Sequence, residues 1–146
     1  MILDPKSWEL ANAIEALLED SGVSGDEGEI KPELHESVLE IATQPCRDVH
    51  EAAAELRGLR RQVAEVAARR ELTIGSAGTH PFALWEDQRI SARPRYRDLI
   101  DMLRFVARQE VIFGLHVHVG IDDADKAIHV ANGMRCLLYT SPSPRD

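Results

Sequence analysis

The chain has 146 residues, of which 17 are Lys or Arg and 25 are Asp or Glu, so its formal net charge is −8. Its 44% hydrophobic content is typical of a folded globular chain, and the length allows a core that needs no disulfide bonds. The acidic balance argues against a protein that binds duplex DNA, because neutralising phosphates requires basic patches. We therefore expect no nucleic-acid partner.

Neither a membrane nor a secretory pathway is indicated. The sequence has no run of about 18 apolar residues, which a transmembrane helix requires. The first residues, MILDPKSWEL, lack the basic region and apolar run of a secretory signal. Cys46 and Cys136 do not form a disulfide framework. We expect a cytoplasmic protein without a membrane partner.

The first third of the chain predicts one helix and one strand. Ser7, which follows an Asp-Pro breaker, predicts a capped helix over about residues 8–19. Residues 21–28, SGVSGDEG, are typical of an exposed loop. Residues 36–43 are short and bounded by prolines, which favours a strand.

The middle of the chain carries the clearest helical pattern. Asp48 is placed to cap a long helix over about residues 49–70, whose apolar residues follow the 3, 4, 7 spacing. Residues 73–80, TIGSAGTH, predict a strand that passes close to other backbone or to a ligand, because small residues recur along it. Residues 81–94 predict an irregular connection.

Two helices and a strand are expected in the last third. The first helix covers about residues 96–109 and is expected to bury Leu99, Met102, Leu103 and Val106. The β-branched alternation of residues 111–121 favours a strand. A last helix, capped by Asp122 or Asp123, continues at least to Arg135.

The motif HVHVG within residues 111–121 is the sharpest chemical feature. On a strand, His116, His118 and Gly120 face one side, with about 6.6–6.8 Å between alternate residues, while the other side is apolar. Neutral imidazoles bind metals and charged imidazoles hold phosphate. The alternative is a pair of half-exposed histidines on a sheet.

Carboxylates form the second feature. Glu33, Glu36 and Glu40 are suited to Mg²⁺ or Mn²⁺, and an added imidazole would favour Mn²⁺. Glu36 and Glu40 share a strand face, but strict alternation places Glu33 and Glu40 on opposite faces unless the chain twists or bulges. A solvated strand face is the alternative.

Two weaker features are a turn and a basic cluster. GSAGTH lacks the Lys-Ser/Thr of a phosphate-binding P-loop, so His80 either lines a site or caps a turn. The basic cluster suits a carboxylate or phosphate, or else marks a solvated helix start; it consists of Arg93, Arg95, Arg97 and Tyr96.

Five stretches occur in this order: ELHESVLEIATQPCRD, LRGLRRQVAEVA, GSAGTHPFALW, RPRYRDL and GLHVHVGIDDADKAIHVANGMR. Together they resemble the bacterial carboxylate–amine ligases of the glutamate–cysteine ligase type 2 family, and the pairing of GTHP with GLHVHVG is specific. The resemblance covers about residues 29–135. It implies an α+β fold with a mainly antiparallel sheet and helices on one side, as part of a glutamine-synthetase-like catalytic fold.

The resemblance also implies a reaction. ATP would phosphorylate a carboxylate, and an amine would attack the acyl phosphate, with glutamate and cysteine as one substrate pair and Mg²⁺ or Mn²⁺ as the metal. The implied metal ligands are Glu33, Glu40 and His116. The residues implied for substrate or phosphate are His118, Arg95, Tyr96, Thr79 and His80.

The match to the family pattern stops near Arg135. We therefore expect residues 1–135 to be a partial catalytic domain without its first strand and C-terminal part, residues 136–146 to be a foreign tail, and the chain to be inactive by itself. The alternatives are a non-catalytic metal- or phosphate-binding α+β module and a scaffold. Convergence of Glu40, His116 and His118 on one face would favour the ligase.

Overall fold

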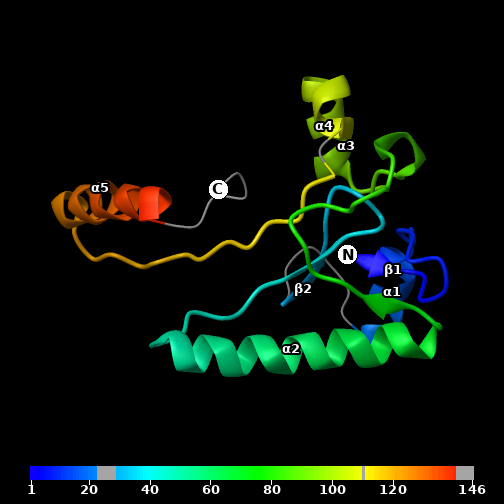
Figure 1. Cartoon of the computed structure of the whole chain (residues 1–146), viewed down its shortest axis with the longest axis horizontal. Coiled ribbons are helices and arrows are strands. Elements are labelled where there is room, and N and C mark those ends of the chain that lie inside the picture. The colour runs from blue at the N-terminus through cyan, green and yellow to red at the C-terminus, as the bar shows by residue number, and fades with distance from the viewer. Residues whose placement is uncertain (23–28, 110, 141–146) are drawn as a thin grey trace. The chain divides into compact units, whose positions relative to one another are not determined.

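The computed structural model describes residues 1–22, 29–109 and 111–140, with side chains up to residue 137. The chain divides into two compact units, Met1–Gly114 and Leu115–Asp146, which are described separately. Helices accompany two small antiparallel sheets (Figure 1), which confirms the expected α+β class. Within the described ranges, no helix is long and apolar enough to cross a membrane.

The sheets of the first unit are two short antiparallel pairs. β1 (Ile2–Leu3) pairs with β4 (Thr73–Ile74), and β2 (Ile30–Pro32) pairs with β3 (Leu39–Ile41). The strands expected over residues 36–43 and 73–80 are therefore confirmed only in part. A backbone hydrogen bond of 2.8 Å from Ile2 N to Ser37 O connects β1 to the segment between β2 and β3.

The register of β2 and β3 corrects the expected arrangement of the glutamates. Lys31 lies directly opposite Glu40, so the chain reverses direction between the two strands. Glu36 lies in the reversing segment, and its backbone oxygen accepts from Ala13 N and Ile14 N at 3.0 and 2.9 Å. The expectation that Glu36 and Glu40 share a strand face is wrong, and no single strand joins Glu33 to Glu40.

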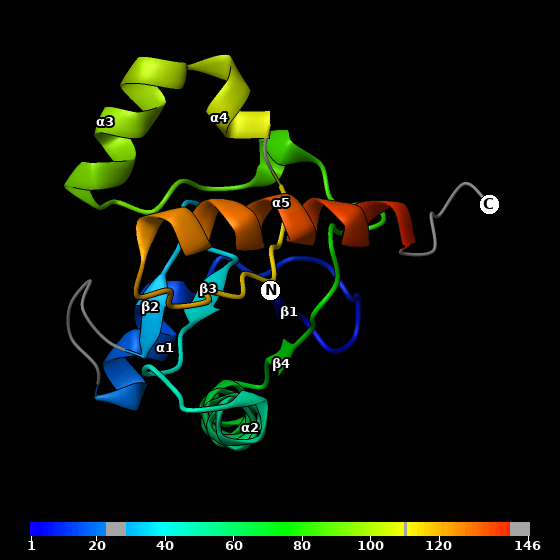
Figure 2. The ribbon, with the colours of Figure 1, turned by 90° about the vertical axis from the view of Figure 1, so that its left-hand side faces the viewer.

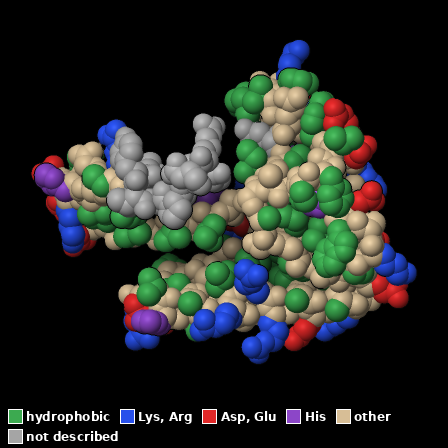
Figure 3. All heavy atoms as spheres, viewed as in Figure 1, with side chains coloured by type: hydrophobic (Ala, Val, Ile, Leu, Met, Phe, Trp, Pro, Cys, Tyr) green, Lys and Arg blue, Asp and Glu red, His purple; other side chains and the backbone are tan. Residues whose placement is uncertain are grey.

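The long helix α2 (Val49–Arg69) confirms the strongest sequence prediction. The Asp48 carboxylate caps it by accepting from His50 N and Glu51 N, both at 2.9 Å. Its buried side chains belong to the main core and are Leu59, Val63, Val66 and Ala67. Figure 2 looks along α2, with β4 beside it, and Figure 3 shows basic side chains along its outer edge.

The first helix begins later than expected. α1 (Ile14–Ser21) has no side-chain cap, and Gly22 follows it in the left-handed conformation with φ 71°. The residues before it pair with β1 instead: Leu10 bridges Leu3, and Ala11 N donates to Ile2 O at 2.9 Å. Tertiary pairing thus overrides local helix propensity and the expected Ser7 cap. Of the predicted loop, residues 23–28 lie outside the described residues.

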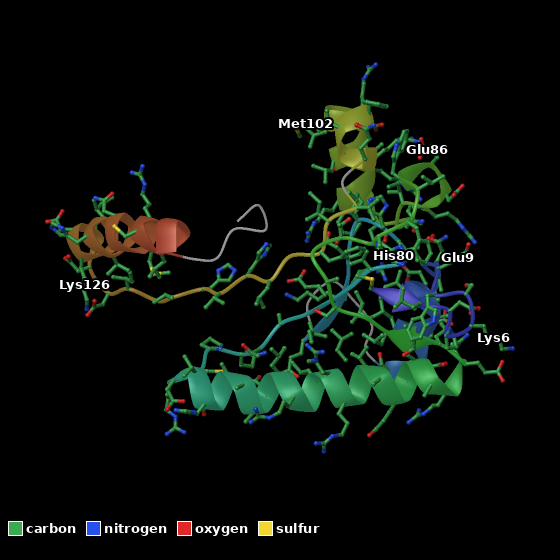
Figure 4. All side chains as sticks on the ribbon, in the orientation of Figure 1. Lys6, Glu9, His80, Glu86, Met102 and Lys126 are labelled. Atoms are coloured by element: carbon green, nitrogen blue, oxygen red, sulfur yellow. The ribbon has the colours of Figure 1, made fainter. Side chains whose placement is uncertain are left out.

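The helix expected over residues 96–109 is divided in two. α3 (Pro94–Leu103) and α4 (Phe105–Gln109) are separated by Arg104, whose φ is 47°. The expected burial was wrong, because Met102 is 75% exposed (Figure 4) and the buried residues are Tyr96 and Ala107. The preceding connection is irregular as predicted, apart from a short 3₁₀ turn, Trp85–Asp87.

The strand expected over residues 111–121 does not form. Among the described residues, pairing is limited to its start: Ile112 bridges Thr79, and Phe113 N donates to Gly78 O at 3.0 Å. In the second unit, Leu115, Val117 and Val119 are 83, 79 and 66% exposed. An alternating pattern identifies the faces of a strand, but the strand itself requires a neighbour to pair with.

The second unit contains one helix, α5 (Ala124–Thr140). Asp123 Oδ1 accepts from Lys126 N at 2.8 Å, which confirms the expected start of this helix. The boundary expected at residue 135 falls inside the helix. Residues 141–146 lie outside the described residues.

Candidate functional site

A shallow pocket in the first unit brings together three of the expected site residues. Its lining consists of Lys31, Pro32, Glu40, Arg95 and Tyr96. These residues come from β2, β3 and the start of α3. Segments more than 50 residues apart in sequence thus contribute side chains to one site.

Two backbone features position these side chains. Antiparallel pairing of Lys31 with Glu40 directs both side chains to the same face of the hairpin. Pro94 at the first turn of α3 favours the start of that helix, because its fixed φ suits a helix N-terminus. The Tyr96 hydroxyl then donates to Pro32 O at 2.8 Å, which fixes the start of α3 against β2.

The pocket contains charges of both signs. The Arg95 guanidinium lies 4.9 Å from the centre of the Tyr96 ring, a cation–π contact. None of the ion pairs between described residues involves Lys31, Glu40 or Arg95. Two cations and one carboxylate therefore face this pocket without an ionic partner in the described part of the chain.

Glu33 stabilises the backbone beside the pocket. Its carboxylate Oε1 accepts from Leu34 N at 2.8 Å, and its backbone oxygen accepts from the Ser91 hydroxyl. Ser91 N in turn donates to Leu34 O at 2.8 Å. Glu33 is absent from the residues that line the pocket.

The polar side chains of the Thr79–His80 turn form hydrogen bonds with backbone groups of the protein. The His80 ring accepts at Nδ1 from Ala83 N at 3.0 Å, and its Nε2 lies 2.9 Å from Trp8 O. Because the carbonyl oxygen can only accept, Nε2 carries the proton and donates. The Thr79 hydroxyl donates to Val111 O at 2.9 Å. His80, which Figure 4 labels, therefore caps a turn, the second of the two roles that the sequence left open.

The paired histidines lie in the second unit. His116 and His118 are exposed, on the extended segment that precedes α5. Across residues 1–22, 29–109 and 111–140, no three His, Cys, Asp or Glu side chains are grouped closely enough to hold a metal ion. The metal role of Glu33, Glu40 and His116 stays a prediction.

Cys46 has a geometry that does not suit a nucleophile. Its thiol donates to Glu55 Oε2 at 3.1 Å, and this hydrogen bond raises the pKa of Cys46. The thiolate is the reactive form, so the carboxylate disfavours reaction.

Lys31 was missed in the sequence because only the hairpin places it beside Glu40. The two residues are nine positions apart, an odd spacing that puts them on opposite faces of any single strand. Pro32, directly after Lys31, was the one local sign in the sequence that a strand could end there. Assigning the reversal to residues 33–38 would have identified the pair.

Comparison with known proteins agrees with the resemblance. The family model described as glutamate-cysteine ligase family 2 matches residues 2–140. A protein of Solibacter usitatus (strain Ellin6076), named "Putative glutamate--cysteine ligase 2", is 40% identical over 136 residues, which is 93% of this chain and 35% of the relative.

Two further relatives carry the same name. The protein of Roseiflexus castenholzii (strain DSM 13941 / HLO8) is 43% identical over 94% of this chain and 36% of its own length. That of Sorangium cellulosum (strain So ce56) is 43% identical over 94% of this chain and 37% of its own length. The chain thus spans about a third of the length of these relatives. Because the family model covers nearly all of it, the chain belongs to glutamate-cysteine ligase family 2.

Proposed function

We propose that this chain serves ATP-dependent carboxylate–amine ligation. ATP would phosphorylate a carboxylate, the amine of the second substrate would attack the acyl phosphate, and phosphate would leave as the amide forms. Glutamate and cysteine are the first substrates to test, because the relatives are named as glutamate–cysteine ligases.

The observation that carries this proposal is the pocket formed by Lys31, Glu40, Arg95 and Tyr96. Both substrates of such a reaction, and every phosphate that takes part, bear negative charge. Cationic side chains that lack internal ion pairs attract such groups, and arginine binds carboxylate and phosphate with a bidentate geometry. This pocket therefore has the donors that a carboxylate or phosphoryl substrate requires.

The metal is a further part of the proposal. Glu33, Glu40 and His116 would hold Mg²⁺ or Mn²⁺, because carboxylate oxygen and imidazole nitrogen together are donors that Mn²⁺ accepts and that a flexible Mg²⁺ site tolerates. When bound, the metal would neutralise charge that develops during phosphoryl transfer. His118 would lie beside it on substrate or phosphate.

A second candidate is a non-catalytic metal- or phosphate-binding module. The exposure of both His116 and His118 on one extended segment favours it, because two imidazoles two residues apart can bind one ligand without the first unit. This module would bind its ligand whether or not Glu40 is present, whereas the ligase would require Glu40.

A chimaeric enzyme tests the ligase proposal. Residues 2–140 of this chain would replace the matching segment of the Solibacter usitatus relative, with the unaltered relative as the reference. ADP release that requires both glutamate and cysteine is the expected result, and hydroxylamine should trap the acyl phosphate as a hydroxamate. If the relative ligates and a folded chimaera does not, the proposal is wrong.

Variants of the chimaera test whether its activity depends on the pocket residues. Lys31→Met or Glu40→Gln should lower ADP release at least about tenfold, the size expected for losing one charged hydrogen bond. Arg97→Met is the control: it removes a positive charge from α3 outside the pocket, and ADP release should change little. Equal losses in all three variants would indicate damage to the fold rather than to the site.

A further inference from the structure

We infer that the exposed face of α2 is a docking surface for an acidic segment of another protein, whose carboxylates bind three neighbouring arginines. These residues, Arg57, Arg60 and Arg61, are called the arginine face. None of them lines the candidate pocket, and the inference does not depend on the proposed ligase function.

The arginine face is exposed and has no ion pair with a described residue. Arg57 lies three and four positions before Arg60 and Arg61, so the three side chains share one face of the helix. All three are exposed, whereas Leu59 and Val63 are buried in the core. None of the ion pairs between described residues includes them. Figure 3 shows basic side chains along the outer edge of α2.

Charged side chains near the two ends of α2 do have partners. Arg47, just before the helix, forms an ion pair with Glu51 at 3.2 Å. Arg70, which follows the last helical residue, forms one with Asp20. Ion pairing therefore occurs at both ends of this helix but, among the described residues, is missing at the arginine face between them.

The arginine face places like charges together in an acidic protein. Charges of the same sign three or four positions apart on a helix repel each other and destabilise it. Residues 57–70 hold five Arg and one Glu, a formal charge of +4, so the rest of the chain carries −12. A charge arrangement that opposes folding and is not compensated by a described partner is typical of a binding surface.

The geometry of the face suits carboxylates on an extended polypeptide. Arginine binds a carboxylate through two parallel hydrogen bonds. Arg57 and Arg61 are four positions apart, which is about 6 Å along the helix axis. Alternate side chains of an extended chain are about 6.6–6.8 Å apart. An extended segment with Asp or Glu at alternate positions therefore matches the spacing of these arginines.

Other anionic partners fit this face less well. Val49, at the first position of α2, is the one large hydrophobic residue that this helix exposes, so the arginine face lacks the apolar anchor of a membrane-bound helix. The helix contains no Phe, Tyr or Trp on which unpaired bases could stack. A nucleic-acid duplex would extend beyond the three arginines and meet the acidic remainder of the chain.

Titration of the 146-residue chain with two synthetic peptides tests the inference. One alternates Glu with Thr over about eight residues, and the other replaces each Glu with Gln; both have blocked ends. Binding is followed by ¹⁵N NMR. The Glu peptide should bind and shift the amide signals of residues 57–61 most, and the Gln peptide should not bind. Binding should weaken between about 50 and 200 mM NaCl, because salt screens exposed charges.

A triple variant assigns the binding to the arginine face. Arg57→Gln, Arg60→Gln and Arg61→Gln together should weaken the Glu peptide at least about tenfold, because three exposed ion pairs are lost. The thermal midpoint of this variant should be unchanged or higher, because the repulsion between the arginines is removed. A role of these arginines in the fold alone would instead lower the midpoint.

A second triple variant controls for the change in net charge. It alters three exposed arginines elsewhere in the first unit: Arg97→Gln, Arg104→Gln and Arg108→Gln. Binding of the Glu peptide to this control should remain close to that of the wild type, because the arginine face is intact.

Four results would overturn the inference. They are no binding of the Glu peptide at millimolar concentration, equal losses in the two triple variants, a lower thermal midpoint of the arginine-face variant, and tighter binding of oligothymidylate or phosphatidylserine vesicles than of the Glu peptide. Because the measurements are peptide binding and thermal unfolding, they are independent of the ligase test: an inactive chimaera would refute the ligase proposal and leave this inference unaffected.

Discussion

The Tyr96 hydroxyl and the Pro32 carbonyl form a buried 2.8 Å hydrogen bond that joins α3 to β2 across 64 positions of the sequence. Both residues also line the candidate pocket. Tyr96→Phe would leave the Pro32 oxygen without its donor, and we expect a loss of about 1–2 kcal/mol in the free energy of unfolding, measured by urea denaturation. An unchanged midpoint would show that water replaces the hydroxyl at no cost.

Gly75 and Gly58 form a matched pair for a second prediction. A Cβ atom at Gly75 would lie 2.7 Å from Leu3 Cδ1 and 3.3 Å from Met1 Cγ, whereas one at Gly58 would meet no described residue within 4 Å beyond its chain neighbours and the backbone of its own helix. Gly75→Ala should destabilise the protein by about 1–3 kcal/mol through overpacking. Gly58→Ala, inside α2, should stabilise it by up to about 1 kcal/mol because alanine favours the helix. Thermal unfolding of the two variants should therefore shift in opposite directions.

The Asp48 cap supports a third prediction. Its carboxylate satisfies two amide groups at the start of α2, so Asp48→Ala should reduce stability by about 1 kcal/mol. Asp98→Ala, an exposed residue within α3, serves as the control for removing an acidic side chain. Urea denaturation followed by circular dichroism measures both, and equal losses would argue against the cap.

The ion pair between Asp20 and Arg70 should make the stability of the folded protein depend on pH. Hydrogen bonds from Arg70 lower the pKa of Asp20, and they join the end of α1 to the end of α2. The unfolded carboxyl has its pKa near about 3.9, so the folded state binds fewer protons. The pair's contribution is therefore complete above that pH and is lost as the pH falls through the lower folded pKa.

Asp20→Asn tests this linkage. The variant should be less stable than the wild type near neutral pH, and the difference should shrink on acidification below about pH 4. Urea midpoints across that range provide the measurement, with Asp98→Asn as the control. A difference that stays constant with pH would mean that Asp20 contributes through packing rather than charge.

Local patterns in the sequence were sufficient to predict some helices and strands but not others. The α2 prediction succeeded because 21 residues carry a consistent apolar stripe and a side-chain cap at the first turn. The predicted start of α1 was wrong because Leu10 and Ala11, which fit the helical pattern, pair with β1 instead. A helical pattern of apolar residues does not show whether the segment pairs with a neighbouring strand instead.

The candidate site, like the fold, was predicted from the sequence only in part. Glu40, Arg95 and Tyr96 were identified from residue type and resemblance, and the structure places them in one pocket. Lys31 was not, because its role follows from a hairpin register rather than from its neighbours in sequence. The alternation around His116 and His118 predicted a strand, but their segment has no paired neighbour among the residues described.

The histidines provide the last prediction, which separates the metal proposal from the module. Mn²⁺ binding is measured on the whole chain by electron paramagnetic resonance. If Glu33, Glu40 and His116 share an ion, then Glu40→Gln and His116→Ala should each weaken Mn²⁺ at least about tenfold, because each removes a ligand. His50→Ala, an exposed histidine of α2, is the control. Loss on His116→Ala and His118→Ala without any effect of Glu40→Gln would favour the module, since the imidazoles would then bind the ion without the carboxylates.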